Sequence, residues 1–264
     1  YRSSQRMNRA DVKRSAGGLV AGVERNDFFG FNAGILAGFG RTDARVNDRS
    51  SDADIDSYTI GAYAGRTFGA VLTKVGTTFT WNDISSQRNV AFPGFTDTLT
   101  ANYNSRTFQA FGEVGYAFGT PYGMFEPFAG LAVVHLETDS FTETGGAAAL
   151  GVNGSSQTLG VSTLGMRGSY QVGVLNDGSI LTFNGALAWR HSFGDVTPSV
   201  TSAFAAGSQP FTVAGTPIDE DTALVEAGFN LAVLERADLS ISYRGEFGQS
   251  AQDNSFNARL GIKF

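Results

Sequence analysis

The stretch Ser255–Phe264, "SFNARLGIKF", decides the fold class because it has two different faces along its whole length. Every second residue is apolar, and the residues between them are mostly polar or charged. This period of two is typical of a β-strand with one buried and one solvated face. Chain ends usually fray, so we expect an apolar strand at this position to have a structural role. The apolar set is Phe256, Ala258, Leu260, Ile262 and Phe264.

The same alternation recurs along the rest of the chain, for example in "TALVEAGFNLAV" and "LSISYRGEF". No stretch has the pattern of an amphipathic helix, so the sequence predicts an all-β protein. The expected strands are Gly17–Arg25, Phe28–Arg41, Ser57–Phe68, Ala70–Asp83, Asn102–Phe118, Gly123–Leu136, Gln157–Val174, Ser179–Phe193, Ala223–Leu234, Asp238–Gly248 and Ser255–Phe264.

The length of these strands favours a membrane barrel. Strands of globular sheets average about five or six residues, whereas a tilted strand needs about 9–11 residues to cross a bilayer. Many of the expected strands reach or exceed that second length. The sequence contains no apolar window long enough for a membrane helix, but alternating strands leave only a weak hydropathy signal.

The connections alternate between short turns and long polar segments. In an up-and-down sheet, alternate connections lie at opposite rims, and outer-membrane barrels have short periplasmic turns and long outer loops. The short turns are "ERND", "TFGA", "FGTPYG", "LNDG" and "ERAD". The expected long loops are Tyr1–Ala16, Thr42–Asp56, Ile84–Ala101, Glu137–Ser156 and Gly194–Thr222.

The fold class that follows is an up-and-down antiparallel transmembrane β-barrel of about 12 strands. Eleven strands are visible in the sequence, and because single-chain barrels prefer even numbers, we expect one more, either in "YRSSQRM" or before Tyr1. No linker or low-complexity tract divides the chain. We therefore expect residues 1–264 to form a single domain.

Composition excludes several function classes. The chain has no cysteine and a net charge of −6. A disulfide framework and a thiolate metal site are excluded, and the acidic balance argues against nucleic acid as a partner. The opening "YRSSQRMNRADVKRS" has no apolar core and so is not a signal peptide.

The motifs that resemble cofactor, metal or catalytic sites are weak. The glycines of "AGILAGFGR" lack the spacing and the following helix of a phosphate-binding loop. "DADID" resembles the start of a calcium loop, but Ser57 stands where such a loop requires glycine, so an exposed acidic loop is the better interpretation. His135 and His191 are the only histidines, too few for a typical zinc site and outside any nucleophile motif. We expect no metal site, no cofactor and no catalytic residue.

Charged residues gather on the polar face of the C-terminal strands, which we expect to face the lumen. Charges in a barrel wall must be paired or hydrated. Two interpretations remain open: an ion network that holds the strands together, and a lumen through which a polypeptide passes without adhering. The expected lumen-facing residues are Arg167, Arg190, Glu226, Arg244, Glu246, Arg259 and Lys263.

Aromatic and basic residues suggest contacts with lipid. Aromatic residues recur near the strand ends, as in the girdles of membrane barrels. The basic cluster in the first 14 residues could meet lipopolysaccharide phosphates, although a solvated loop explains it equally well. Its members are Arg2, Arg6, Arg9, Lys13 and Arg14.

The C-terminal half resembles the translocator domain of autotransporters, the type V secretion proteins. The stretches that carry the resemblance are "ALAWRHSFGDVTPSVTSAFAAGSQPFTVAGTPIDEDTALVEAGFNLAV", "LSISYRGEFGQSAQDNSFNARLGIKF", "EPFAGLAVVHLETDSFTETGGAAAL" and "STLGMRGSY". The resemblance implies a 12-stranded outer-membrane barrel that exports an N-terminal passenger to the cell surface, with a helical linker in the pore. It also implies that Gly194–Thr222 is an extended outer loop, with Pro198–Phe204 and Phe211–Pro217 as hairpin arms.

The function expected is therefore a translocator pore and anchor in the bacterial outer membrane, not an enzyme. A small-solute porin and a barrel enzyme are the alternatives. In the family that the chain resembles, the barrel-assembly machinery recognises a terminal strand ending in Phe. The corresponding assembly signal here is Phe256, Leu260, Ile262 and Phe264. Deleting Phe264, or making it charged, should impair insertion more than the same change at Ala258.

Overall fold

The computed structural model describes residues 12–46, 51–121, 123–215, 217–233 and 237–262. Nearly all of them lie in β-strands, and they include no helix that could cross a membrane. The first strands are β1 (Val12–Phe28), β2 (Phe31–Val46), β3 (Ser51–Phe68), β4 (Val71–Phe92), β5 (Phe95–Tyr116), β6 (Phe118–Thr120), β7 (Gly123–Thr138) and β8 (Phe141–Thr142). They are followed by β9 (Leu150–Val152), β10 (Ser155–Val174), β11 (Ile180–Gly194), β12 (Ser199–Phe204), β13 (Phe211–Ala214), β14 (Asp221–Val233), β15 (Ala237–Phe247) and β16 (Gln252–Ile262).

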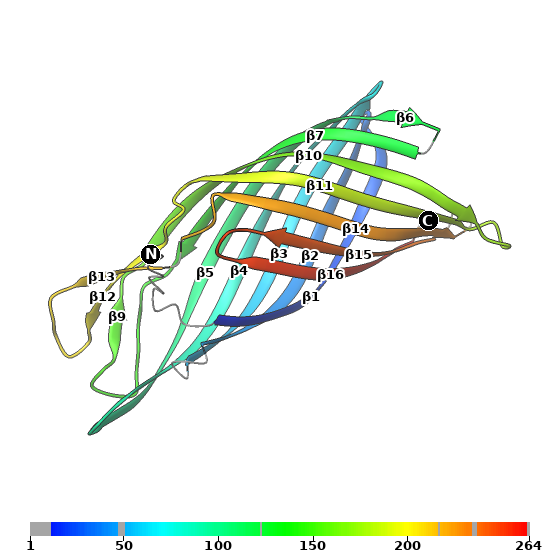
Figure 1. Ribbon diagram of the computed structural model, residues 1–264. Coiled ribbons are helices and arrows are strands. Elements are labelled where there is room, and N and C mark those ends of the chain that lie inside the picture. The colour runs from blue at the N-terminus through cyan, green and yellow to red at the C-terminus, as the bar shows by residue number, and fades with distance from the viewer. Residues whose placement is uncertain (1–11, 47–50, 122, 216, 234–236, 263–264) are drawn as a thin grey trace, which may run out of the picture.

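Most strands form one antiparallel sheet that curls around a central space (Figure 1). It is 12-stranded and runs in the order β1-β2-β3-β4-β5-β7-β10-β11-β14-β15-β16, with β6 paired to β7. Most neighbours in the sheet follow one another along the chain. The exceptions are β5 and β7, separated by β6, then β7 and β10, separated by β8 and β9, and β11 and β14, separated by β12 and β13. The expected all-β, up-and-down sheet of about 12 strands is confirmed, and each of the eleven expected strands is present.

Two of the expected long loops are wrong, because the structure continues the strands through them, and the described part of a third, residues 12–16 of Tyr1–Ala16, belongs to β1. Ile84–Ala101 is the outer half of a hairpin in which β4 and β5 pair residue for residue up to Phe92 and Phe95. The tip "FPGF" is a two-residue turn in which Gly94 has φ 85°. Pro followed by a glycine with positive φ is the signature of a type II turn. The expected loop Thr42–Asp56 is likewise mostly strand, since β2 and β3 pair up to Val46 and Ser51.

A second, smaller sheet lies at the end of the molecule reached by the β4–β5 hairpin (Figure 1). It has four strands in the order β13-β12-β9-β8. Its hairpin β12–β13 coincides with the arms expected within Gly194–Thr222, and that expectation is confirmed. The expected loop Glu137–Ser156 supplies the other two strands.

The apolar side chains face outward. Among the described residues, only five hydrophobic residues are buried, and two of these five are alanines. In contrast, Phe256 is 83 % exposed and Leu187 is 65 % exposed. A water-soluble sheet would bury such residues in a core. The arrangement is that of a sheet whose outer surface meets lipid.

The strands β1 and β16 are the two edges of the main sheet. Eleven strands lie on the path, each antiparallel to the next, so its first and last members run in the same direction. An ion pair spans the two edges: Arg14 Nη2 lies 2.8 Å from Asp253 Oδ2. The edges therefore approach each other, and the sheet curls nearly into a cylinder.

Candidate functional site

The candidate site is the inner wall formed by β10, β11, β14 and β15, together with Lys74, Glu113 and Glu126 on the inner faces of the neighbouring strands β4, β5 and β7. On these strands, alternation places the charged residues on the face opposite the exposed apolar side chains such as Leu187 and Trp189. Cross-strand register aligns Arg167 with Ala186, Ala186 with Glu226, and Glu226 with Arg244. These side chains consequently share one face across four strands.

Arg167 is the centre of the largest ion cluster on this wall. Its Nη2 donates hydrogen bonds of 2.5 Å to Glu113 Oε1 on β5 and to Glu126 Oε1 on β7. Lys74 Nζ on β4 lies 3.6 Å from the same Glu113 oxygen. The guanidinium also lies over the ring of Phe128, 4.5 Å from its centroid. One arginine thus connects three neighbouring strands by bonds between side chains.

Two further pairs continue the pattern toward the sheet edge. Arg190 Nη1 donates a 2.5 Å hydrogen bond to Glu246 Oε2, and Thr222 Oγ1 donates to the other oxygen of the same carboxylate at 3.1 Å. Arg244 Nε donates to Glu226 Oε1 on the adjacent strand. Charge-assisted bonds of this kind are stronger than neutral ones and hold strands in register.

The structure brings together most of the charged residues expected in the lumen. Arg259 lies on the inner face of β16, opposite Ser240, and forms no ion pair among the described residues. Lys263 lies outside the described residues. Sequence reasoning missed three partners, namely Lys74, Glu113 and Glu126. Alternation gave little signal for the two acids, because Glu113 and Glu126 share their faces with apolar residues such as Phe111 and Phe128.

The wall is balanced in charge and hollowed. Its ion pairs join four basic residues to four acidic ones: Lys74, Arg167, Arg190 and Arg244, with Glu113, Glu126, Glu226 and Glu246. Two open hollows of about 290 Å³ and 240 Å³ share Arg167, Ala186 and Glu226. Small residues such as Ala186 leave this space beside paired charges. The surface can therefore contact a polar chain without presenting an uncompensated charge.

The terminal strand presents its apolar residues on the outer face. Phe256, Leu260 and Ile262 are 83 %, 67 % and 66 % exposed. The ring of Phe256 contacts that of Tyr243 on β15, with centroids 5.2 Å apart. Phe264 lies outside the described residues. Three of the four residues expected to form an assembly signal thus lie on one outward surface at an edge of the sheet.

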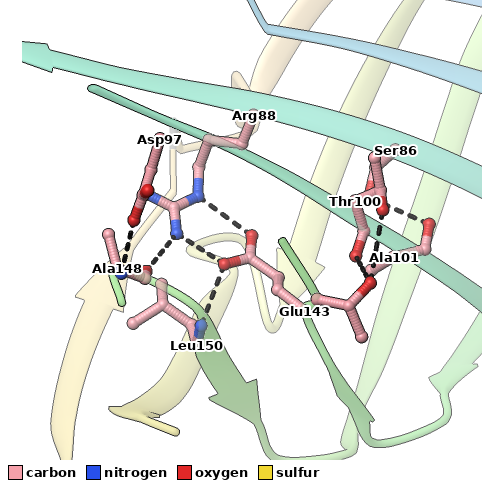
Figure 2. Close-up of polar contacts among 9 residues, drawn as sticks. Ser86, Arg88, Asp97, Thr100, Ala101, Glu143, Ala148 and Leu150 are labelled. Carbon is pink, nitrogen blue, oxygen red and sulfur yellow. Dashed lines mark hydrogen bonds and ion pairs between the residues drawn. The ribbon is translucent and has the colours of Figure 1, made fainter. Parts of the chain in front are cut away.

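A compact polar cluster fixes the small sheet to the β4–β5 hairpin (Figure 2). Arg88 on β4 donates from Nε and Nη2 to the two carboxylate oxygens of Glu143, at 2.9 Å and 2.5 Å. The backbone N–H of Leu150 donates to Glu143 Oε2, and Asp97 accepts from the N–H of Ala148. The Glu143 side chain is only 10 % exposed. The hydrogen bonds to Glu143 raise the pKa of Arg88 above its usual value.

The two histidines have ordinary partners. His191 Nδ1 lies 3.0 Å from Asp221 Oδ1, which also accepts a hydrogen bond from Trp189 Nε1. His135 Nδ1 lies 2.9 Å from Thr158 Oγ1. Over the described ranges, no group of three or more His, Cys, Asp or Glu residues could hold a metal ion.

The acidic run "DADID" lies on β3, where it pairs with β2. Asp54 is directly opposite Asp43, and their carboxyl groups share a hydrogen bond. The bond and the neighbouring negative charge raise the pKa of Asp54. Arg41 compensates in part, with its Nε 3.9 Å from Asp56 Oδ1. The run is therefore strand and not loop, and it is exposed.

Comparison with known proteins identifies the family to which this chain belongs. The family model described as the autotransporter β-domain matches residues 1–244. The chain therefore belongs to the autotransporter β-domain family. Two relatives from Serratia marcescens, both described as extracellular serine protease, are 33 % and 32 % identical over 97 % of this chain. The chain spans 24 % of the length of each of these relatives.

Solved structures agree on the fold. The translocator domain of autotransporter NalP from Neisseria meningitidis matches with a TM-score of 0.74 at 15 % identity, over 96 % of this chain and 81 % of that one. The β domain of the Bordetella autotransporter BrkA matches with a TM-score of 0.66 at 18 % identity, over 96 % and 92 % of the two chains. At these identities the likeness concerns the fold.

Proposed function

We propose that this chain is the outer-membrane pore and anchor through which an N-terminal passenger is exported to the cell surface. The observation that supports this most strongly is the inner wall, where four basic side chains are paired with four carboxylates while the outer wall is apolar. Family membership supports the same function. In this proposal residues 1–264 act as one domain and carry no catalytic chemistry of their own.

Charge balance suits the passage of a polypeptide. A lumen with a strong net charge would retain segments of opposite charge and repel segments of like charge. Here the basic residues around Ala186 are each bound to a carboxylate, so the wall offers hydrogen bonds without a large field. A linker helix of the same protein is the occupant that we propose for the hollows beside Arg167 after export.

The parallel orientation of the two edge strands, β1 and β16, supports the proposal that one additional strand lies between them. In an antiparallel barrel, a strand that pairs with both β1 and β16 runs antiparallel to each of them. Adding this one strand gives the barrel an even number of strands. Arg14 and Asp253 can touch across such a strand, because Arg167 on β10 reaches Glu113 on β5 across β7 in the same way. We place this strand before Val12 in the sequence.

We propose two binding partners for the outer surface of the sheet. The exposed face of Phe256, Leu260 and Ile262 lies on an edge strand, which can pair with the barrel-assembly machinery before closure. Lipopolysaccharide is the proposed partner of the outer rim. Of the basic cluster expected to bind it, Arg14 is bound to Asp253. The other members are residues whose side chains the structure does not describe.

The test uses the full-length protein with an epitope in its passenger. Ala186→Phe narrows the inner wall, and Ala129→Phe adds the same side chain on the outer face of β7. We expect Ala186→Phe to insert normally, seen as heat-modifiable gel migration, and to lower passenger exposure on intact cells severalfold. Ala129→Phe should leave exposure unchanged.

The result that would overturn the proposal is full surface exposure of the passenger when residues 12–264 are deleted. Conductance in planar bilayers adds a second readout. An open pore for small solutes, together with export that Ala186→Phe does not affect, would identify a porin instead.

A further inference from the structure

The outer face of β1 to β5 has a large apolar hollow. Its volume is about 770 Å³, and small residues form its floor while bulky ones form its walls. Cross-strand register places Ala21 opposite Ala37, Ala37 opposite Ile60, and Ile60 opposite Phe79. The floor residues on this face are Ala21, Ala37 and Ala62, and the wall residues are Val23, Ile35, Ile60, Phe79 and Phe108.

The hollow lies within the part of the strands that crosses the membrane. On β3, Tyr58 and Phe68 face outward about ten residues apart, a length that matches one crossing. On β4, Trp81 lies a similar distance from the short turn after Phe68. Ile60 and Ala62 of β3 line the hollow, and along the strand both are nearer to Tyr58 than to Phe68. On these strands it therefore opens toward the outer leaflet.

The chemistry of the lining excludes a polar ligand. On the outer face of the sheet, the polar side chain that lines the hollow is that of Thr77. Its hydroxyl already donates a 2.9 Å hydrogen bond to the carbonyl of Gln109. Among the residues that the structure describes, no charged residue lines the hollow. A lipid headgroup in the hollow would have neither a hydrogen-bond donor nor a counter-charge to compensate for its lost hydration. A hydrocarbon chain has no polar group to desolvate, so it can enter without that cost.

We propose that this hollow holds one acyl chain of an outer-leaflet lipid, retained longer than the lipid around the rest of the wall. The inference rests on the membrane placement argued above. The hollow is continuous with the outward apolar surface of Leu19, Phe39 and Val75, so lipid has access to it from the side. A chain lying against Phe79 and Phe108 gains contact with two rings as well as with the floor.

The chain provides its own reporters, because it has two tryptophans. Trp81 lies beside the hollow, with its ring 4.5 Å from that of Phe79. Trp189 lies on the outer face of β11, at a comparable distance from its short turn and away from the hollow. Trp189→Phe leaves Trp81 as the reporter, and Trp81→Phe leaves Trp189.

The experiment reconstitutes residues 1–264 in phosphatidylcholine bilayers with a small fraction of lipid brominated at mid-chain. Bromine quenches tryptophan on contact. We expect Trp81 to be quenched roughly threefold more than Trp189 at low bromolipid fraction, which corresponds to a modest excess affinity. Ala62→Leu or Ala37→Leu should fill the hollow and reduce the quenching of Trp81 to that of Trp189. Ala129→Leu, a matched change on the outer face of β7, should not.

Two outcomes would overturn the inference. The first is equal quenching of the two tryptophans in the unfilled protein. The second is quenching of Trp81 that Ala62→Leu and Ala37→Leu leave unchanged while both variants retain heat-modifiable migration. Protection of Trp81 that increases with protein density would assign the hollow to a second copy of the chain. Absence of quenching at both tryptophans would instead contradict the membrane placement itself.

Discussion

Arg167 holds two carboxylates from different strands, and its side chain is 27 % exposed. Glu126 is still less accessible, with 10 % of its side chain exposed. Removing the arginine would leave Glu126 without its basic partner in a poorly solvated place, and Glu113 with Lys74 alone, 3.6 Å away. The cost of breaking such a pair is larger than the net value of the pair itself.

We therefore predict that Arg167→Ala lowers the free energy of unfolding by about 2–4 kcal/mol, in the range for partly buried pairs that lose one partner. Urea titration of the protein folded into lipid vesicles measures this. Arg106→Ala is the control, because Arg106 is 47 % exposed and its contacts with Glu137 and Asp139 are 3.9 Å and 3.6 Å long. An exposed pair of that kind should cost less than about 1 kcal/mol. Equal losses in the two variants would contradict the role assigned to Arg167.

Asp54 gives a prediction about pH. Its pKa is raised by the hydrogen bond with Asp43, so its protonated form is favoured in the folded hairpin. The stabilisation is fully present below the unfolded value of about 4 and is lost as pH rises through the folded pKa. Asp54→Asn should slow amide exchange of Ser51–Asp56 at neutral pH and have little effect in acid. A variant that exchanges faster than the parent at neutral pH would show that the two carboxyl groups do not repel each other.

At the scale of the elements, the alternation of polar and apolar residues predicts all eleven strands on the path of the main sheet. The outer halves of β4 and β5 were not predicted as strands, although the small sheet covers one of their faces and buries Leu99 and Ala101. Residues 84–101 are mostly polar and do not alternate strictly, a pattern that is typical of a loop. The turn "FPGF" was the available signal, since Pro-Gly between paired segments indicates a hairpin.

The same limit applied to the candidate site. Alternation correctly placed Arg190, Glu226, Arg244 and Glu246 on one face, but it could not pair them. Arg190 bonds to Glu246 across β14, a contact that depends on register and side-chain reach. Pairing over such distances is a property of the curled sheet and not of any one strand.

The cluster around Arg88 makes a prediction at this scale. Arg88→Ala removes the hydrogen bonds to Glu143 and leaves that carboxylate with little access to water. We expect amides of β8 and β9 to exchange about 10–100-fold faster, while the membrane-spanning strands are unaffected. Hydrogen exchange with mass spectrometry measures both regions together.

Ser85→Ala is the matched control for that experiment. Ser85 lies on the same strand and its hydroxyl bonds to Asn102 in an exposed position. Its loss should leave exchange in the small sheet unchanged. If Arg88→Ala also left it unchanged, the small sheet would be held by its other contacts, such as the stacked rings of Tyr103 and Phe141, whose centroids are 4.0 Å apart.

For the whole molecule, the decisive question is what lies between the edges β1 and β16. The edges run parallel to each other, while all the pairings of the main sheet are antiparallel. An ion pair between Arg14 and Asp253 spans them. If one strand lies between the edges, their backbones are about 10 Å apart, which is two strand spacings.

This distance can be measured with cysteines, because the chain has none of its own. The double variant Arg14→Cys and Asp253→Cys is made in the full-length protein. A disulfide requires Cβ atoms about 3.5–4.5 Å apart, so an intervening strand forbids it. We expect no disulfide on oxidation, and efficient cross-linking by a reagent with a spacer of about 10 Å, since two strand spacings separate the edges. The same variant in a chain that begins at residue 12 allows the edges to meet and should form the disulfide readily. A disulfide that forms equally well in both proteins would mean that β1 and β16 close the barrel directly, and the proposed additional strand would have to be abandoned.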